Sequence, residues 1–154
     1  MKVDRALMLL YAVTDRAWLG DSTLAQQVEK AIKGGATFIQ LREKNLDYEA
    51  FLKQAIEVKK VTDRYNIPFV INDNIDVAIT CNADGVHVGQ SDMEAGDVRS
   101  RLGEDKIIGV SAETVEQAKQ AEKNGADYLG VGAMFSTSTK LDAETITFDT
   151  LKDI

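Results

Sequence analysis

The chain has 154 residues, of which 44% are hydrophobic and 28% charged, which is enough to bury the core of a single domain spanning residues 1–154. Its 25 acidic and 18 basic residues give a net charge of −7, and no run of lysine and arginine offers a surface for nucleic acid. A lone cysteine, Cys81, excludes an internal disulfide, and a lone histidine, His87, excludes zinc sites built from several such ligands. Any metal should therefore be a hard cation bound by oxygen.

The first apolar run, residues 6–13, follows Lys2 and Arg5 and superficially resembles the start of a secretory signal. Polar residues 14–16 follow it directly and no small-residue cleavage pattern appears, which favours a buried first strand. No other apolar run approaches the roughly 20 residues that cross a bilayer. We therefore expect a cytoplasmic protein with no membrane partner.

Short β-rich runs alternate with longer amphipathic stretches, a pattern that predicts repeated strand and helix units in a parallel sheet. The six predicted strands cover residues 9–13, 37–41, 68–71, 85–88, 106–110 and 128–131. An open doubly wound sheet has the same periodicity, but no strand here is followed by a G-x-G-x-x-G turn. The pattern favours an α/β fold of the (β/α)8 TIM-barrel type, with about six of the eight βα units in this chain and no linker.

Two predicted helices have clear ends. Thr23 and Gln26 have the spacing of a capping box, and the glycine pair 34–35 ends the helix that follows. Its apolar face carries Leu24, Val28, Ala31 and Ile32. The next helix is predicted over residues 48–65, before Pro68 forces an extended chain. Its inner stripe is expected to include Leu52, Ala55 and Ile56.

Polar side chains follow most predicted strands, at the end where a parallel barrel assembles its active site. After the second strand comes the segment QLREK at residues 40–44, in which Gln40, Arg42 and Lys44 would point the same way while the chain stays extended. Arg forks onto two phosphate oxygens and Lys adds a point charge, so this segment could clamp an anion. Solvated loop charges paired with Glu43 explain the same segment equally well.

Carboxylates follow the third and fourth strands. Asp73 comes directly after Asn72, and Asp92 ends the segment that contains His87, so the two aspartates could converge above adjacent strands. Two carboxylates at one opening would suit Mg²⁺, which bridges carboxylates to phosphate oxygens. Either aspartate alone could instead cap a turn or a helix.

Three further features carry weaker signals. Ser111 follows the fifth strand and could donate its hydroxyl to phosphate, although a structural turn bond is the simpler interpretation. Residues 136–140 offer four hydroxyls and an ammonium group, which suits either a loop that closes over anions or a polar surface connection. His87 titrates near neutrality, but it lies among valines in an alternating strand, so we expect a packed or hydrogen-bonded side chain. Cys81 is expected to be a small core residue.

Together these motifs resemble those of the thiamine-phosphate synthase family over almost the whole chain. The matching segments, in chain order, are residues 11–15, 40–44, 72–73, 85–92, 109–111 and 137–140. The resemblance implies a TIM barrel that couples hydroxymethylpyrimidine diphosphate with hydroxyethylthiazole phosphate, using Mg²⁺ and releasing pyrophosphate. In that family the diphosphate leaves first, and the thiazole nitrogen captures the resulting pyrimidine methyl cation.

The resemblance also implies residue roles. The substrate-binding residues would be Gln40, Arg42, Lys44, Asn72, Ser111, Thr137, Thr139 and Lys140. Of these, the catalytic set would be Arg42, Lys44, Ser111 and Lys140. The metal ligands would be Asp73 and Asp92.

Two departures from the family pattern affect these expectations. Ser136 stands where the family usually has proline, and the chain ends within the helix after the sixth strand, so strands seven and eight are absent. An exposed sheet edge would favour a homo-oligomer or indicate a truncated product. The alternative function is a noncatalytic truncated or regulatory relative, including the thiazole tautomerase type, that binds phosphate compounds only. The joint presence of Asp73, Asp92 and Lys140 favours a synthase. Another phosphate-using barrel, such as an epimerase, fits the fold but does not explain the QLREK segment.

Overall fold

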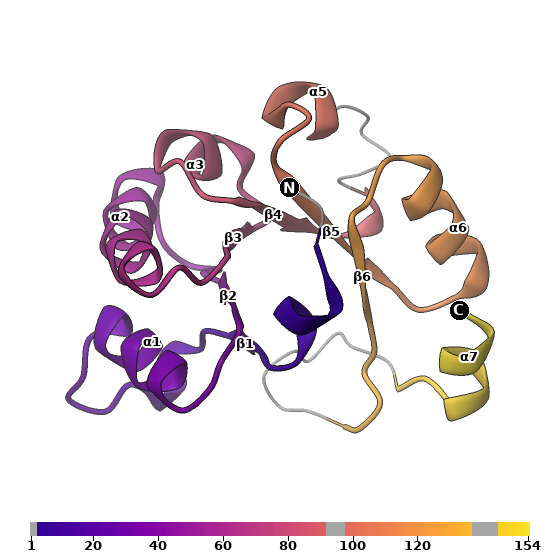
Figure 1. Ribbon diagram of the computed structural model, residues 1–154, viewed down its shortest axis with the longest axis horizontal. Coiled ribbons are helices and arrows are strands. Elements are labelled where there is room, and N and C mark those ends of the chain that lie inside the picture. Colours follow the sequence, from indigo (N-terminus) through magenta and orange to yellow (C-terminus); the bar gives the residue numbers. More distant parts are fainter. Residues whose placement is uncertain (1–2, 92–97, 137–144) are drawn as a thin grey trace.

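The computed structural model describes residues 3–91, 98–136 and 145–154. Its centre is a six-stranded sheet in which every strand runs parallel to, and pairs with, the next strand along the chain. The sheet curls, and the connecting helices cover its outer face (Figure 1). A doubly wound sheet would reverse its strand order at a switch point, and this sheet does not. The expected TIM-barrel architecture, with six of its βα units, is confirmed.

The strands are short and regularly spaced. They are β1 (Tyr11–Val13), β2 (Phe38–Leu41), β3 (Phe69–Asn72), β4 (Gly85–Val88), β5 (Ile107–Ala112) and β6 (Tyr128–Val131). The α-helices are α1 (Leu24–Lys33), α2 (Tyr48–Tyr65), α3 (Ile75–Thr80), α5 (Val98–Leu102), α6 (Val115–Lys123) and α7 (Phe148–Asp153). Two 3-10 helices, η1 (Arg5–Met8) and η2 (Arg16–Trp18), flank β1. None of the helices in the described part of the chain is both long and apolar enough to span a membrane.

The expectation of a buried first strand over residues 9–13 is wrong. The strand begins only at Tyr11, Leu9 is 79% exposed and Val13 is 49% exposed. The preceding residues form η1 instead, because the carboxylate of Asp4 accepts hydrogen bonds from the first two N–H groups of that turn. The apolar run is thus divided between a 3-10 helix and a three-residue strand.

Two apolar clusters lie on opposite faces of the sheet. The larger cluster packs the sheet against α1, α2, α3 and α5. The smaller one lies inside the curl, where Phe38, Val70 and Ile107 contact Leu7 and Met8 of η1. The N-terminal segment accordingly crosses the inside of the curl in Figure 1. Because both faces are covered, the strands are almost continuously apolar.

The two best-defined helices confirm most of their predicted features. Thr23 and Gln26 form the capping box of α1, and Gly34 caps its carboxyl end. Helix α2 covers Tyr48–Tyr65 as predicted and ends at Asn66 in the left-handed conformation. Ile56 was wrongly placed in its inner stripe, since it is 39% exposed. The buried side chains instead follow the 3.6-residue period at Phe51, Ala55, Val58, Val61 and Thr62.

The amino ends of two strands are fixed by aspartates placed just before them. The Asp84 carboxylate accepts a hydrogen bond from the Phe69 N–H at 2.9 Å, and the Asp84 N–H donates to the Phe69 carbonyl at 2.8 Å. Asp127 makes the same pair of bonds to Ile108, at 2.8 and 2.7 Å. Each aspartate therefore joins the start of its own strand to the start of the preceding one.

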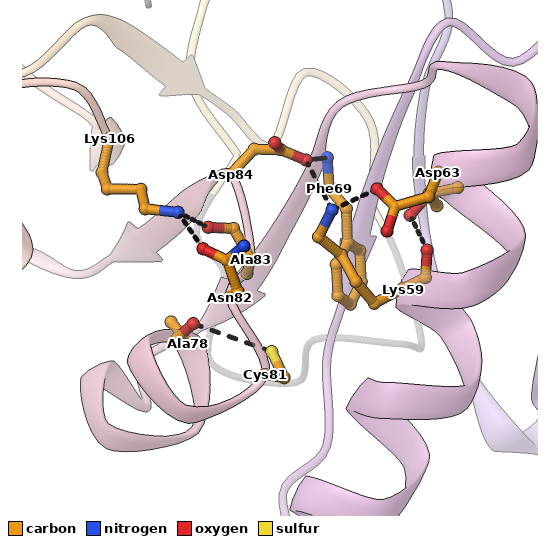
Figure 2. A network of polar contacts seen from close by, with 10 residues as sticks. Lys59, Asp63, Phe69, Ala78, Cys81, Asn82, Ala83, Asp84 and Lys106 are labelled. Atoms are coloured by element: carbon orange, nitrogen blue, oxygen red, sulfur yellow. Dashed lines mark hydrogen bonds and ion pairs between the residues drawn. The ribbon is translucent and has the colours of Figure 1, made fainter.

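Lysine and arginine side chains complete this amino-end network, part of which is drawn in Figure 2. Lys106 donates to Asn82 Oδ1 and to the Ala83 carbonyl, at 2.8 and 2.7 Å. Lys59 of α2 pairs with Asp63 and approaches Asp84. Cys81 is buried beside it and directs its thiol toward the Ala78 carbonyl at 3.7 Å, which confirms it as a core residue.

Candidate active site

Polar side chains occupy the inside of the curl above the apolar cluster. Because side chains alternate along a strand, Gln40 lies on the same face as Phe38, Asn72 on the same face as Val70, and Ser111 on the same face as Ile107. In each of these strands the apolar residue lies toward the amino end and the polar residue toward the carboxyl end. The polar residues predicted as substrate contacts therefore share one opening with those of adjacent strands.

A chain of hydrogen bonds crosses this interior. Gln40 Nε2 donates to Tyr11 Oη at 2.8 Å, and Tyr11 Oη lies 2.6 Å from Tyr128 Oη. Tyr128 Oη lies 3.1 Å from His87 Nδ1, and His87 Nε2 lies 3.0 Å from Ser111 Oγ. These residues come from five different strands, so the chain connects β2 to β5 through the centre of the barrel. It confirms a hydrogen-bonded His87.

Two glycines make room for this chain. A Cβ atom on Gly109 would lie 2.1 Å from the ring of Tyr128, and a Cβ on Gly130 would lie 2.9 Å from the ring of His87. Tyr11 also stacks on Phe38, with ring centroids 4.8 Å apart. The two tyrosines were not identified from the sequence, although Tyr11 begins the first matching segment and both lie on strands at positions that can face inward.

The two phenols are uncharged groups at neutral pH. Burial raises the pKa of Tyr11 to about 12, and hydrogen bonds with Tyr128 and Gln40 oppose part of that rise. Burial also raises the pKa of Tyr128, and its proximity to Tyr11 raises it further. The interior therefore offers neutral donors and acceptors, which suit a polar ring more than a charged group.

Charged groups lie at the rim, beyond the carboxyl ends of β2 and β3. Lys44 Nζ is 2.8 Å from Asp73 Oδ2, which also accepts a hydrogen bond from Asn72 Nδ2 at 2.6 Å. Asp73 has a positive φ of 60°, a conformation that aspartate adopts more readily than most residues, and its N–H donates to the His87 carbonyl at 2.9 Å. An anion-binding type of residue and a metal-binding type of residue are thus in direct contact.

These rim residues border a cavity of about 550 Å³ between the strand ends and helices α2, α3 and α5. Its polar lining consists of Glu43, Lys44, Asn72, Asp73, Asn74, Asp76 and Arg101. A second ion pair, Arg101 Nη2 to Asp76 Oδ1 at 2.5 Å, lies on the side formed by α3 and α5. The cavity therefore contains both signs of charge, as a site for a metal and a phosphate would require.

Glu43 differs from expectation, because it does not pair with Arg42 or Lys44. Its side chain is only 4% exposed, and its Oε2 accepts a hydrogen bond from Arg16 Nε at 2.9 Å. Arg16 also donates to Gln54 Oε1 at 2.7 Å, which ties η2 to α2. The interpretation of residues 40–44 as loop charges neutralised by Glu43 is therefore wrong.

The predicted anion clamp is not a single row of side chains. Strand β2 ends at Leu41, so the extended geometry assumed for residues 40–44 does not continue to Lys44. Gln40 bonds within the interior, Lys44 contacts Asp73 at the rim, and the Arg42 N–H donates to Thr14 Oγ1 at 3.0 Å. Ser111 lies within β5 rather than after it. The predicted residues Asp92, Thr137, Thr139 and Lys140 lie outside the described residues.

The fold and the site define a class of protein: a parallel α/β barrel whose strand carboxyl ends carry groups suited to phosphates and a hard cation. A family model described as thiamine monophosphate synthase matches residues 10–154. Thiamine-phosphate synthases of Ruminiclostridium cellulolyticum and Clostridium acetobutylicum are 55% and 54% identical over 145 residues, which cover 94% of this chain and 69% of each relative. The structure of thiamine phosphate pyrophosphorylase from Pyrococcus furiosus superposes with a TM-score of 0.78 at 34% identity, covering 96% of this chain and 69% of that one.

The chain belongs to the thiamine-phosphate synthase family. Its function is accordingly that of a transferase in thiamine biosynthesis. The alternative of a noncatalytic relative is not favoured, since relatives that share half or more of its residues carry the synthase name.

Proposed function

We propose that this site couples hydroxymethylpyrimidine diphosphate with hydroxyethylthiazole phosphate, giving thiamine phosphate and pyrophosphate. The observation that supports this most is the contact between Lys44 and Asp73 at 2.8 Å, at the carboxyl ends of adjacent strands. A diphosphate that carries a metal ion needs both kinds of group within reach of one another.

We assign the diphosphate to Arg42 and Lys44 at the rim, with Gln40, Asn72 and Ser111 as further polar contacts. Arginine offers a planar fork to two phosphate oxygens, and lysine offers a mobile ammonium group. The family resemblance adds Thr137, Thr139 and Lys140 to the substrate contacts and Lys140 to the catalytic set. Binding at Lys44 would exchange its present partner, Asp73, for a phosphate oxygen.

We propose Mg²⁺ as the cofactor, with Asp73 and Asp92 as its protein ligands. Among the described residues, no group of three or more His, Cys, Asp or Glu side chains is arranged to hold a metal. That donor set fits Mg²⁺, which takes one or two carboxylates and completes its shell with waters and substrate phosphates. Mg²⁺ bound there would stabilise negative charge on the diphosphate.

The chemistry requires charge stabilisation and orientation rather than a protein nucleophile. The bond between the pyrimidine methylene carbon and the diphosphate oxygen breaks, pyrophosphate leaves with the electron pair, and the thiazole nitrogen forms the new bond to carbon. Lys44 and Arg42 offset the charge that develops on the leaving group. The neutral network of Gln40, Tyr11 and His87 offers hydrogen bonds to the pyrimidine and limits the space for water.

The direct test is to measure pyrophosphate and thiamine phosphate together, with both substrates, in Mg²⁺ and then after chelation. We expect the two products in a one-to-one ratio, loss of both on chelation, and recovery when Mg²⁺ is restored. Arg42→Ala should raise the KM for the pyrimidine diphosphate on the order of tenfold, whereas Arg64→Ala, on the outer helix α2, should not. Pyrophosphate release without thiamine phosphate would contradict coupling.

We also propose self-association and a cytoplasmic location. The outer strands of the described sheet are β1 and β6, and Val13 on β1 is half exposed, so a second copy has an edge to pair with. Light scattering should then give a mass that rises with protein concentration, and a concentration-independent monomer would contradict the association. The location follows from the biosynthetic role of the family, and cell fractionation would test it.

A further inference from the structure

One carboxylate oxygen of the rim cavity is buried and has no hydrogen-bond donor. It is Oε1 of Glu43, which receives no hydrogen bond within the described part of the chain, although the side chain is only 4% exposed. The other oxygen, Oε2, is held by Arg16 Nε at 2.9 Å. The unpaired oxygen is thus a specific feature of a side chain that is otherwise well anchored.

An unpaired buried acceptor is costly, and more so when it belongs to a carboxylate. Native structures rarely leave such an atom without a partner, and the usual partner is a water or an ion. Glu43 lines the same cavity as Lys44, Asn72 and Asp73. The missing donor is therefore expected to be in the cavity that we assign to the metal and the diphosphate.

Two candidate donors or roles within the protein are disfavoured. The Lys44 ammonium group is next in sequence, but it is engaged with Asp73. Direct metal ligation by Glu43 together with other carboxylates is also disfavoured, because the described side chains include no cluster of three or more that could hold a metal. A donor that belongs to a bound ligand or to its water shell explains the free oxygen better.

We propose that Glu43 is a positioning residue, whose Oε1 accepts a hydrogen bond from a water bound to the Mg²⁺ at Asp73. This inference rests on the proposed function. Mg²⁺ keeps several of its waters when it binds a protein, and a metal-bound water is a strong hydrogen-bond donor. Groups that hold such outer waters orient the metal and strengthen its binding. Glu43 thereby fixes the metal from the side of the cavity that borders β2.

The contact with Arg16 makes a sharp substitution possible. A guanidinium group only donates hydrogen bonds, so in Glu43→Gln the amide oxygen must face Arg16. The amide NH₂ group must then face the cavity, where it presents donors in place of the acceptor. This variant keeps the size of the side chain and its anchor, and it reverses the hydrogen-bonding character of the one atom in question.

Asp76→Asn is the matched control. Asp76 lines the same cavity and its replacement removes the same charge, but its side chain is exposed and is paired with Arg101 at 2.5 Å. A loss of affinity that came only from net charge would appear in both variants. A loss specific to the buried acceptor would appear in Glu43→Gln alone.

The experiment is a titration of the full chain and its variants with Mn²⁺, used as a spectroscopic probe for Mg²⁺, with free Mn²⁺ counted by electron paramagnetic resonance. We expect Glu43→Gln to weaken Mn²⁺ binding about tenfold, Asp76→Asn to stay within about twofold of the wild type, and Glu43→Asp to recover part of the loss. Asp73→Asn serves as the marker for the site and should abolish binding. Thermal unfolding of each variant checks that it folds.

The outcomes separate this inference from the proposal on which it depends. If Asp73→Asn abolishes binding and Glu43→Gln leaves the Kd unchanged, the role of Glu43 is overturned while the metal site stands. Equal losses in Glu43→Gln and Asp76→Asn would also overturn it, in favour of a general charge effect. If the wild type binds no Mn²⁺, or Asp73→Asn binds it normally, the metal site itself is wrong and the inference fails with it.

Discussion

At the amino ends of the strands, polar side chains bond to the backbone of neighbouring strands, whereas at the carboxyl ends they bond mainly to one another. Asp84 and Asp127 each accept from the first N–H of the preceding strand, and Lys106 donates to a loop carbonyl. At the opposite end Lys44 contacts Asp73, and Glu43 keeps an unpaired oxygen. The same residue types are present at both ends of one sheet.

This difference separates structural from functional charges. A side chain bonded to backbone groups cannot leave without stranding a buried N–H or carbonyl, so it fixes the fold. Two side chains bonded to each other can exchange that bond for a ligand at small cost. Substitutions at the two ends should consequently have opposite effects on activity and on stability.

The largest expected contrast is between two lysines. Lys44→Ala should lower kcat/KM on the order of 100-fold, because it removes a cation that offsets charge on the leaving group, and should leave stability nearly unchanged. Lys106→Ala should do the reverse: it should cost about 1–2 kcal/mol, since Asn82 and Ala83 lose their shared donor, and should leave kcat/KM within about twofold. Steady-state kinetics and urea denaturation measure the two effects. Similar effects of both substitutions on activity would remove the distinction.

Asp127 tests the amino end alone. Asp127→Ala removes the acceptor for the Ile108 N–H and the partner of Arg99 Nη2, which lies 2.7 Å away, and should cost roughly 2–3 kcal/mol. Asp127→Asn should recover about half of this loss, because an amide oxygen still accepts from that N–H. Urea denaturation gives both values. A loss below about 0.5 kcal/mol for the alanine variant would show that the amino-end network does little for stability.

The interior between the two ends should respond to alkali. Burial raises the pKa of Tyr11 from 10 to about 12, so folding favours the neutral phenol. That contribution is fully present below pH 10 and is lost as the pH rises from 10 through 12, amounting to about 1.4 kcal/mol at pH 11. Tyr11→Phe has no proton to lose, so its stability should fall less between pH 8 and pH 11, as measured by urea denaturation. Equal falls would indicate that Tyr11 is not buried as a neutral group.

Local signals in the sequence were sufficient for the barrel scaffold. Strands β4 and β6 and helix α2 have the predicted bounds, because glycine and proline punctuate the chain and the caps use short side chains. Strand β1 was mispredicted because an apolar run does not reveal that Asp4 will cap a 3-10 turn within it.

The site was predictable only in outline. Position after a strand was enough to bring Lys44 near Asp73, since parallel strands end on the same side. The partners that decide function came from far along the chain: Arg16 is 27 residues from Glu43, and Tyr11 is 117 residues from Tyr128. Such contacts depend on the register and curl of the sheet, and no local pattern encodes them.

The central claim, that the carboxyl-end rim is the site of a metal-dependent synthase, is tested most directly at Asp73. The measurement is Mg²⁺-dependent pyrophosphate release from both substrates by Asp73→Asn, beside the wild type and Asp84→Asn. The account predicts a loss of at least about 100-fold for Asp73→Asn with an unchanged unfolding curve, and near wild-type rates for Asp84→Asn. Wild-type rates in a well-folded Asp73→Asn variant would contradict it.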